Sequence, residues 1–188
     1  MSSFDVTPTP LAGLMLVTRG RREDSRGFFS RLFCGQEMAG LGWLLPIAQI
    51  NHSLTGQKGS VRGMHFQFPP HAEDKYVSCL RGEVFDVAID LREGSPSFMR
   101  WHGERLSAKN GRSMLIPQGF AHGFQSLESD CELIYLHSRP YAAHAEGGLH
   151  PNDPRLAITW PLPVVDLSAR DAGHAMVGSD FPGLRCAA

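Results

Sequence analysis

The chain has 188 residues, of which 42% are hydrophobic and 20% are charged, and this composition argues against disorder. Eighteen basic and nineteen acidic side chains give a net charge of -1, so no global positive field points to nucleic acid or an anionic membrane as a partner. A chain of this length can bury a sizeable core, and we expect one domain spanning residues 1–188.

The start of the chain, its apolar segments and its cysteines favour a cytoplasmic protein. Residues 1–5 lack the basic segment and apolar run of a secretory signal, and no apolar stretch reaches the roughly 18 residues of a membrane-spanning helix. The cysteines, Cys34, Cys79, Cys131 and Cys186, are scattered without paired spacing, which is typical of reduced thiols. We therefore expect no membrane partner.

Short apolar runs separated by glycine and proline predict strands rather than long helices. In chain order, strands are predicted at residues 61–68, 75–80, 83–91, 113–116 and 131–138. Closely spaced strands with little helix are typical of a sandwich or barrel, in which strand edges are closed or protected.

Helical signals are few. Residues 36–40 predict one short turn of helix, and residues 168–172 begin with a Ser-x-x-Asp pattern that resembles a capping box. We expect both segments to be minor additions to a strand-based fold.

The segment 83–91 alternates most clearly. Its apolar face consists of Phe85, Val87, Ile89 and Leu91. The other face includes Asp86 and Asp90, and a face with two carboxylates is expected to be solvated or functional. We therefore predict a half-buried strand.

Two histidines stand in positions that suggest a barrel mouth. The spacing from Gly111 through Pro117-Gln118-Gly119 to His122 matches the second half-motif of the cupin jelly roll, in which a tight turn precedes an inward-pointing histidine. In the first half-motif, Gln67 stands where a metal-binding cupin has the second histidine after His65. Two histidines do not supply the three protein ligands that a catalytic metal usually has, so no metal is expected. By itself, His65 is either a hydrogen-bonded interior histidine or a general base.

A long series of motifs surrounds these histidines. It comprises residues 61–67, Pro69-Pro70, Lys75, 82–92, 95–96, 106–108, 116–124, Tyr135, 152–154 and 160–161. Together they resemble the dTDP-4-dehydrorhamnose 3,5-epimerase family, from about Gly13 to Asp171. The resemblance implies an all-β, cupin-type jelly-roll barrel with a few short helices, a homodimer, and no metal or other cofactor. It also implies a nucleotide-sugar substrate, dTDP-4-dehydro-6-deoxy-glucose, whose C3 and C5 protons lie next to the C4 ketone.

The resemblance also implies a catalytic set. His65 resembles the base and Asp171 its orienting carboxylate, although Asp171 could instead belong to the local helix cap. Lys75 resembles the group that stabilises the enolate, with a solvated strand-end lysine as the alternative. Tyr135 resembles the acid on the opposite face, although it could be a core residue; its neighbour at position 137 is a histidine, which suggests a polar lining.

Further residues match the family's substrate contacts. They are Arg26, Phe29, Gln49, Asn51, Arg62 and His122, with Glu146 and Arg170 as weaker candidates carried by position. Arginine suits a diphosphate because its donors form a bidentate fork. Strict alternation puts Arg62 on the face opposite His65, and either a bulge at Gly63 or a neighbouring subunit's site would reconcile the two.

Three positions depart from the family pattern. Arg31 stands where a nucleotide-side glutamate is usual, Pro140 replaces the first of two tyrosines, and Pro151 replaces a tryptophan. Arg31 remains a candidate substrate contact of reversed charge. The sequence thus predicts a 3,5-epimerase of deoxysugar synthesis, such as the L-rhamnose pathway for surface polysaccharide. It leaves open an epimerase of one carbon or another nucleotide, a non-catalytic sugar-nucleotide-binding cupin, and a metal-dependent cupin.

Overall fold

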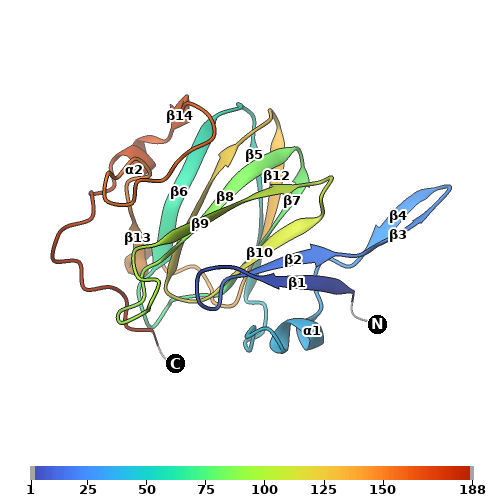
Figure 1. Ribbon diagram of the computed structural model, residues 1–188, viewed down its shortest axis with the longest axis horizontal. Helices are drawn as coiled ribbons and strands as arrows, with labels where there is room; N and C mark the ends of the chain where they lie inside the picture. The colour runs from blue at the N-terminus through green and yellow to red at the C-terminus, as the bar shows by residue number, and fades with distance from the viewer. Residues whose placement is uncertain (1–2, 187–188) are drawn as a thin grey trace.

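The computed structural model describes residues 3–186 and is built mainly from two facing β-sheets (Figure 1). The first sheet contains, in spatial order, β1 (Phe4–Pro8), β2 (Met15–Arg19), β10 (Arg112–Ile116), β7 (Lys75–Arg81), β12 (Cys131–His137) and β5 (Gln49–Thr55). The second contains β13 (Glu146–Gly148), β6 (Ser60–Gln67), β11 (Phe120–Ser126), β8 (Glu83–Asp90) and β9 (Trp101–Ser107), and the short β14 (Asp166–Leu167) pairs with β6. Only the β14–β6 pairing is parallel among these described strands.

The five predicted strands are confirmed as β6, β7, β8, β10 and β12, with ends that differ by one residue or less. Helix is limited to α1 (Gly35–Ala39), α2 (Ala169–Ala172) and the 3-10 turn η1 (Ala143–Ala145) in the described part of the chain, so both predicted helical segments are also confirmed. Within residues 3–186, no helix is long and apolar enough to cross a bilayer. All four cysteines are free thiols, as expected.

The main core fills one end of the space between the sheets. Its buried side chains come from both sheets and from the β1–β2 loop: Leu11, Leu14, Val77, Cys79, Val84, Ala88, Leu106, Met114, Ile116, Phe120, Phe124, Cys131 and Leu133. Apolar packing at this end fixes the separation of the sheets at the other end, where polar side chains gather.

The prediction that residues 83–91 form a half-buried strand is wrong. Asp86 and Asp90 are fully buried, and so are the apolar residues of β8 apart from Phe85, which is half-buried. β8 lies between β11 and β9, so neither of its edges is open. Its inner face joins the main core, while the C-terminal segment covers its outer face through a second cluster that includes Leu156, Val177 and Leu184. Side chains of the protein replace water as partners of Asp90 and of Oδ1 of Asp86, whereas Oδ2 of Asp86 is buried without a hydrogen-bond partner among the described residues.

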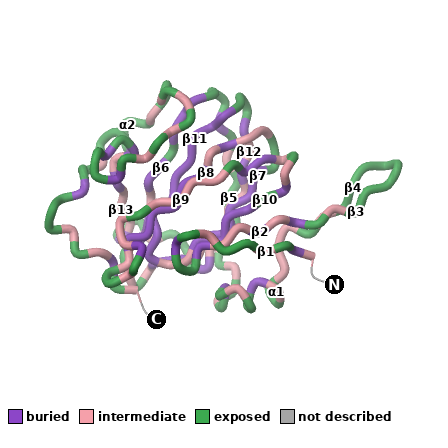
Figure 2. Tube along the Cα trace, in the orientation of Figure 1, coloured by how far each residue is buried: buried purple, intermediate pink, exposed green. Residues whose placement is uncertain are grey.

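The hairpin formed by β3 (Arg21–Asp24) and β4 (Gly27–Ser30) extends away from both sheets (Figure 1). Its tip is exposed along both strands (Figure 2). Phe28 and Phe29 keep 57% and 70% of their surface accessible, which is unusual for large apolar side chains next to each other.

Strand β6 contains a bulge beside β11. His65 pairs with His122, but Arg62 pairs with Phe124, so two residues of β6 lie opposite the single residue Gly123. Gly63 is at the bulge with a φ of +127°, and a Cβ there would lie 2.5 Å from the Cα of Gly123. Only glycine fits this position without displacing the neighbouring strand.

Candidate active site

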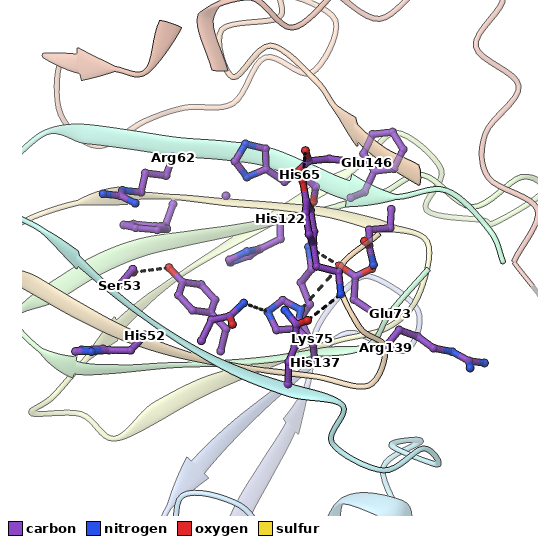
Figure 3. Close-up of a pocket in the computed structure, with 18 residues that line it drawn as sticks. His52, Ser53, Arg62, His65, Glu73, Lys75, His122, His137, Arg139 and Glu146 are labelled. Carbon is purple, nitrogen blue, oxygen red and sulfur yellow. Dashed lines mark hydrogen bonds and ion pairs between the residues drawn. The ribbon is translucent and has the colours of Figure 1, made fainter. Parts of the chain in front are cut away.

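A cavity of about 490 Å³ opens between the two sheets (Figure 3), and it adjoins the main core at Phe124. Eight of the predicted site residues line it: Gln49, Asn51, Arg62, His65, Lys75, His122, Tyr135 and Glu146. Arg62 and His65 approach from β6 in the second sheet, whereas Ser53 and His137 approach from β5 and β12 in the first. Groups on two independent sheets therefore face one ligand-sized space.

His65 and Asp171 form a histidine–carboxylate pair. The Nε2 atom of His65 lies 2.8 Å from Oδ1 of Asp171, and the backbone N–H of Gly63 donates to Oδ2 at 3.1 Å. Burial raises the pKa of Asp171, but the hydrogen bonds from His65 and Gly63 outweigh it and bring the pKa below its ordinary value. The carboxylate is therefore charged and holds the imidazole by Nε2. No residue in 3–186 hydrogen-bonds the other ring nitrogen, Nδ1.

The helix-capping alternative for Asp171 is compatible with this role. Ser168 is the N-cap of α2, and its hydroxyl accepts a hydrogen bond from the backbone N–H of Asp171 at 3.0 Å. The backbone of Asp171 thus completes the cap while its side chain is left for His65. The cap orients the carboxylate because it fixes the first turn of the helix.

The bulge at Gly63 resolves the position of Arg62. The extra residue in β6 turns Arg62 to the same side as His65, and both side chains line the cavity. Of the two explanations considered from the sequence, the bulge is confirmed. It also aims the Gly63 N–H at Asp171 rather than at the strand ladder.

Lys75 is buried beside His65. Its Nζ atom lies 3.1 Å from Oε1 of Glu73 and donates to the backbone carbonyl of His65 at 3.2 Å. The solvated-lysine alternative is therefore wrong. An ammonium group has three donors, so one remains for a ligand in the cavity.

Tyr135 lines the cavity from the first sheet, and its hydroxyl lies 3.0 Å from the Ser53 hydroxyl. Burial raises the pKa of the Tyr135 phenol far above its ordinary value, so the phenol is protonated at neutral pH. Its ring stacks on His137 with centroids 6.4 Å apart. Burial and the charges of Lys75 and His122 lower the pKa of His137 to about 3, so this imidazole is neutral. The expected polar lining is confirmed.

His122 forms a second histidine–carboxylate pair. Its Nε2 atom lies 2.8 Å from Oδ1 of Asp86, and both residues are buried. The ring lies edge-on to Tyr135 with centroids 6.2 Å apart. His122 therefore sits between the two sheets with its orientation fixed by Asp86.

Gln67 organises the cavity mouth. Its amide nitrogen donates to Oε2 of Glu73 at 2.8 Å and to the His71 carbonyl at 2.9 Å, and its oxygen accepts from the Ala142 N–H at 2.6 Å. An amide can donate and accept at once, which a metal-bound histidine cannot. The position where a metal-binding cupin has a histidine thus ties the 71–73 loop to the 140–142 segment.

Five predicted or noted positions lie elsewhere. Arg26 is in the turn of the projecting hairpin, Phe29 is on β4 and Arg31 directly follows β4. None of the three lines this chain's cavity. Arg31 donates to the Ser3 hydroxyl at 3.1 Å and pairs with Glu37. Arg170 is not among the lining residues, but it pairs with Glu146, which is. The Pro151 carbonyl accepts from the Trp160 indole, away from the cavity.

Other cavity residues were not found from the sequence. They include Ser53, Glu73, Arg139 and Tyr141. Ser53 follows Asn51 by two positions on β5, so alternation along that strand could have indicated it. Glu73 comes from the loop before β7, where no periodic pattern applies.

This arrangement defines a class of protein. A charged carboxylate keeps one imidazole oriented, a buried ammonium group adjoins it, and a protonated phenol enters from the facing sheet. An all-β barrel with these groups around one cavity is suited to moving a proton onto and off a carbon next to a carbonyl, which is the chemistry of an epimerase.

The chain belongs to the dTDP-4-dehydrorhamnose 3,5-epimerase family, whose model matches residues 8–178. It is 40% identical over 169 residues to the dTDP-4-dehydrorhamnose 3,5-epimerase of Sinorhizobium fredii, covering 87% of this chain and 85% of that protein. It is 41% identical over 165 residues to the dTDP-4-dehydrorhamnose 3-epimerase of Streptomyces niveus, covering 87% and 79%.

Among solved structures, the 3,5-epimerase of Legionella pneumophila in complex with dTDP-4-keto-L-rhamnose superposes with a TM-score of 0.90 at 37% identity, covering 98% of this chain and 99% of that chain. The cupin-type jelly-roll expectation is thereby confirmed. The chain is a sugar-nucleotide epimerase, and hence an isomerase.

Proposed function

We propose that this chain epimerises dTDP-4-dehydro-6-deoxy-D-glucose at C3 and C5 to dTDP-4-dehydro-L-rhamnose, with His65 as base and Tyr135 as acid. One observation carries the assignment: the two side chains line a single cavity from opposite sheets. Each reacting C–H bond lies next to the C4 ketone, so removing its proton gives an enolate. A proton returned from the other face inverts the carbon.

Proton removal is assigned to the free Nδ1 atom of His65. Because Asp171 accepts the Nε2–H, the lone pair of the neutral ring is on Nδ1. The charged carboxylate then stabilises the imidazolium that forms when Nδ1 takes the substrate proton.

Charge that develops on O4 of the sugar is assigned to Lys75 and His122. The buried ammonium of Lys75 has a donor to spare, and the Asp86-bound ring of His122 faces the same space. Charge stabilisation is strong there because the groups are fixed and largely removed from water.

Proton return is assigned to the Tyr135 hydroxyl. Its raised pKa keeps the phenol protonated until the neighbouring enolate demands the proton. One inversion leaves imidazolium at His65 and phenolate at Tyr135. A proton must pass from the imidazolium side to the phenolate through solvent before the second carbon reacts.

The chain is further proposed to act as a homodimer in which each projecting hairpin serves the partner's cavity. Three candidate substrate residues, Arg26, Phe29 and Arg31, lie away from this chain's own cavity. Adjacent exposed phenylalanines at the hairpin tip suit a nucleotide base or another subunit.

The finer expectations from the sequence belong to the same proposal. A single domain is supported because β1 and the segment around Leu184 join the same pair of sheets from opposite ends of the chain. A cytoplasmic location and a role in polysaccharide synthesis accord with the deoxysugar substrate.

Incubation with dTDP-4-dehydro-6-deoxy-D-glucose in deuterated buffer tests the function. We expect deuterium at both C3 and C5 of the product. The relative named a 3-epimerase makes single-site epimerisation the second candidate, and label at C3 alone would establish it. Absence of label from every nucleotide 4-ketosugar would leave only a binding protein, and activity lost on chelation and restored by metal would indicate a metal-dependent cupin.

A further inference from the structure

His174 lies beside the His65–Asp171 pair, and the proposed mechanism does not use it. Its Nε2 atom is 3.9 Å from Oδ1 of Asp171, and its ring is edge-on to that of His65 with centroids 5.7 Å apart. That Nε2 atom is buried and has no hydrogen-bond partner within residues 3–186. A buried polar nitrogen without a partner requires an explanation.

The ring of His174 is held in place by packing. It lies against Gly148 of β13, where any side chain would collide with the imidazole. The side chain retains only 18% of its accessible surface. This packing directs the unpartnered nitrogen at the His65–Asp171 pair.

Two imidazole nitrogens and one carboxylate oxygen converge here. The ligand atoms of His65, Asp171 and His174 all lie within 4.8 Å of one another. Two histidines and one carboxylate suit a borderline divalent ion such as Zn²⁺, which commonly has three protein ligands and one water in an open site. Small side-chain shifts would bring these atoms to bonding distance of one ion.

We propose that His65, Asp171 and His174 form an inhibitory site for Zn²⁺. An ion at this place binds Nε2 of His65 and removes the hydrogen bond from that nitrogen to Asp171. A neutral imidazole that binds metal through Nε2 carries its proton on Nδ1. The proton of the ring moves from Nε2 to Nδ1 through solvent, with none gained or lost. The nitrogen assigned as the base is then already protonated.

The binding step stands independently of the proposed function, whereas the inhibition rests on it. Another histidine pair complicates a simple zinc titration, because the Nε2 atoms of the half-buried His71 and the exposed His144 lie 3.3 Å apart. That separation also suits two ligands of one tetrahedral ion. The experiment therefore starts from the His144→Ala protein, in which the surface pair is removed and the cluster is intact.

Calorimetric titration of the His144→Ala protein with ZnCl2 is expected to give one site per chain. The His144→Ala/His174→Ala protein is expected to bind Zn²⁺ about tenfold or more weakly. Loss of a residue that only hydrogen-bonds a metal ligand already costs about tenfold in affinity, and loss of a ligand should cost at least as much. His174→Phe in the same background keeps a ring against Gly148 without a ligand atom, so a matching loss there excludes misfolding as the cause.

Epimerase activity supplies the second measurement. ZnCl2 is expected to inhibit the wild type and the His144→Ala protein alike, EDTA to reverse the inhibition, and His174→Ala to raise the inhibitory concentration about tenfold or more. Equal Zn²⁺ binding by the His144→Ala protein with and without His174 would overturn the site. Binding that depends on His174 but leaves turnover untouched would overturn the inhibition, and an inactive wild type would point to the proposed function instead.

Discussion

The backbone N–H of Gly63 donates a 3.1 Å hydrogen bond to Oδ2 of Asp171, 108 residues further along the chain. The other carboxylate oxygen holds His65, two positions after Gly63 on the same strand. One bulge therefore positions the carboxylate and, through Arg62, one wall of the cavity.

Gly63→Ala tests the bulge. The new Cβ would lie 2.5 Å from the Cα of Gly123, and the φ of +127° at residue 63 disfavours any side chain. We therefore expect the free energy of unfolding to fall by at least about 1–3 kcal/mol. Activity should also fall because relief of the crowding would move the backbone N–H that donates to Asp171. Gly94→Ala is the matched control, since Gly94 also has a positive φ but nothing lies within 4 Å of its Cβ position. Equal losses in the two variants, measured by chemical denaturation, would argue against crowding at the bulge.

His65→Asn should reduce turnover by roughly 10²–10⁴-fold or more, because a positioned base is lost. Deuterium incorporation at both carbons should fall with it. Binding of dTDP, measured by calorimetry, should be nearly unchanged because the proposed role of the His65 ring is at the sugar, which dTDP lacks. Full activity in this variant would exclude His65 as the base.

Tyr135→Phe should separate exchange from inversion. Without the phenol, His65 can still remove a proton and return deuterium from the same face, so label should enter the recovered substrate. Epimer formation should drop by roughly 10²-fold or more. The comparison variant, Ser53→Ala, removes only the partner of the phenol and should have a milder effect. Inverted product at the wild-type rate from Tyr135→Phe would mean that another acid serves the far face.

Acid should destabilise the folded protein through His137. In the folded state the pKa of His137 is about 3, below its ordinary value of 6.5, so between these pH values the unfolded chain binds a proton that the folded chain does not. Stability from this residue is present above pH 6.5 and is lost as the pH falls toward 3. His137→Gln should flatten the decline in the free energy of unfolding between pH 6.5 and 4, by a few kcal/mol at most. Parallel pH profiles for the two proteins would contradict this.

Mixing two inactive proteins should restore activity if the hairpin acts in the partner. One protein carries His65→Asn and the other carries Arg26→Ala with Phe29→Ala. After subunit exchange at equal amounts, half the dimers are hybrids with one intact site each, so about a quarter of wild-type activity is expected. If the hairpin variant alone has wild-type kinetics, the hairpin is not part of the site. If that variant is active but has a raised KM, the hairpin contributes only to substrate binding.

Much of the fold could be predicted from the sequence because its central strands alternate clearly and are separated by glycine and proline. β3 and β9 have few apolar residues, so periodicity did not indicate them. β8 was predicted to be half-buried because single-strand patterning does not show that the C-terminal segment covers its outer face.

In the site too, residues within sequence motifs could be predicted, whereas residues brought together only by folding could not. His65 and His122 follow motif spacing, whereas the partnership of Asp171 with His65 came from family resemblance, since 106 residues separate them. Glu73 and His174 lie outside the strands, where no periodicity applies, and their roles depend on contacts that only the folded chain brings together.

Because the proposed base His65 and the proposed acid Tyr135 lie on different sheets, the distance between them is a property of the whole barrel. The gap at the cavity depends on how tightly side chains such as Val77, Ala88 and Leu133 interlock at the closed end. Volume changes there would tilt one sheet against the other and alter which ring carbon meets both groups. Substitutions at residues that never touch the sugar would thus change whether an epimerase inverts one carbon or two.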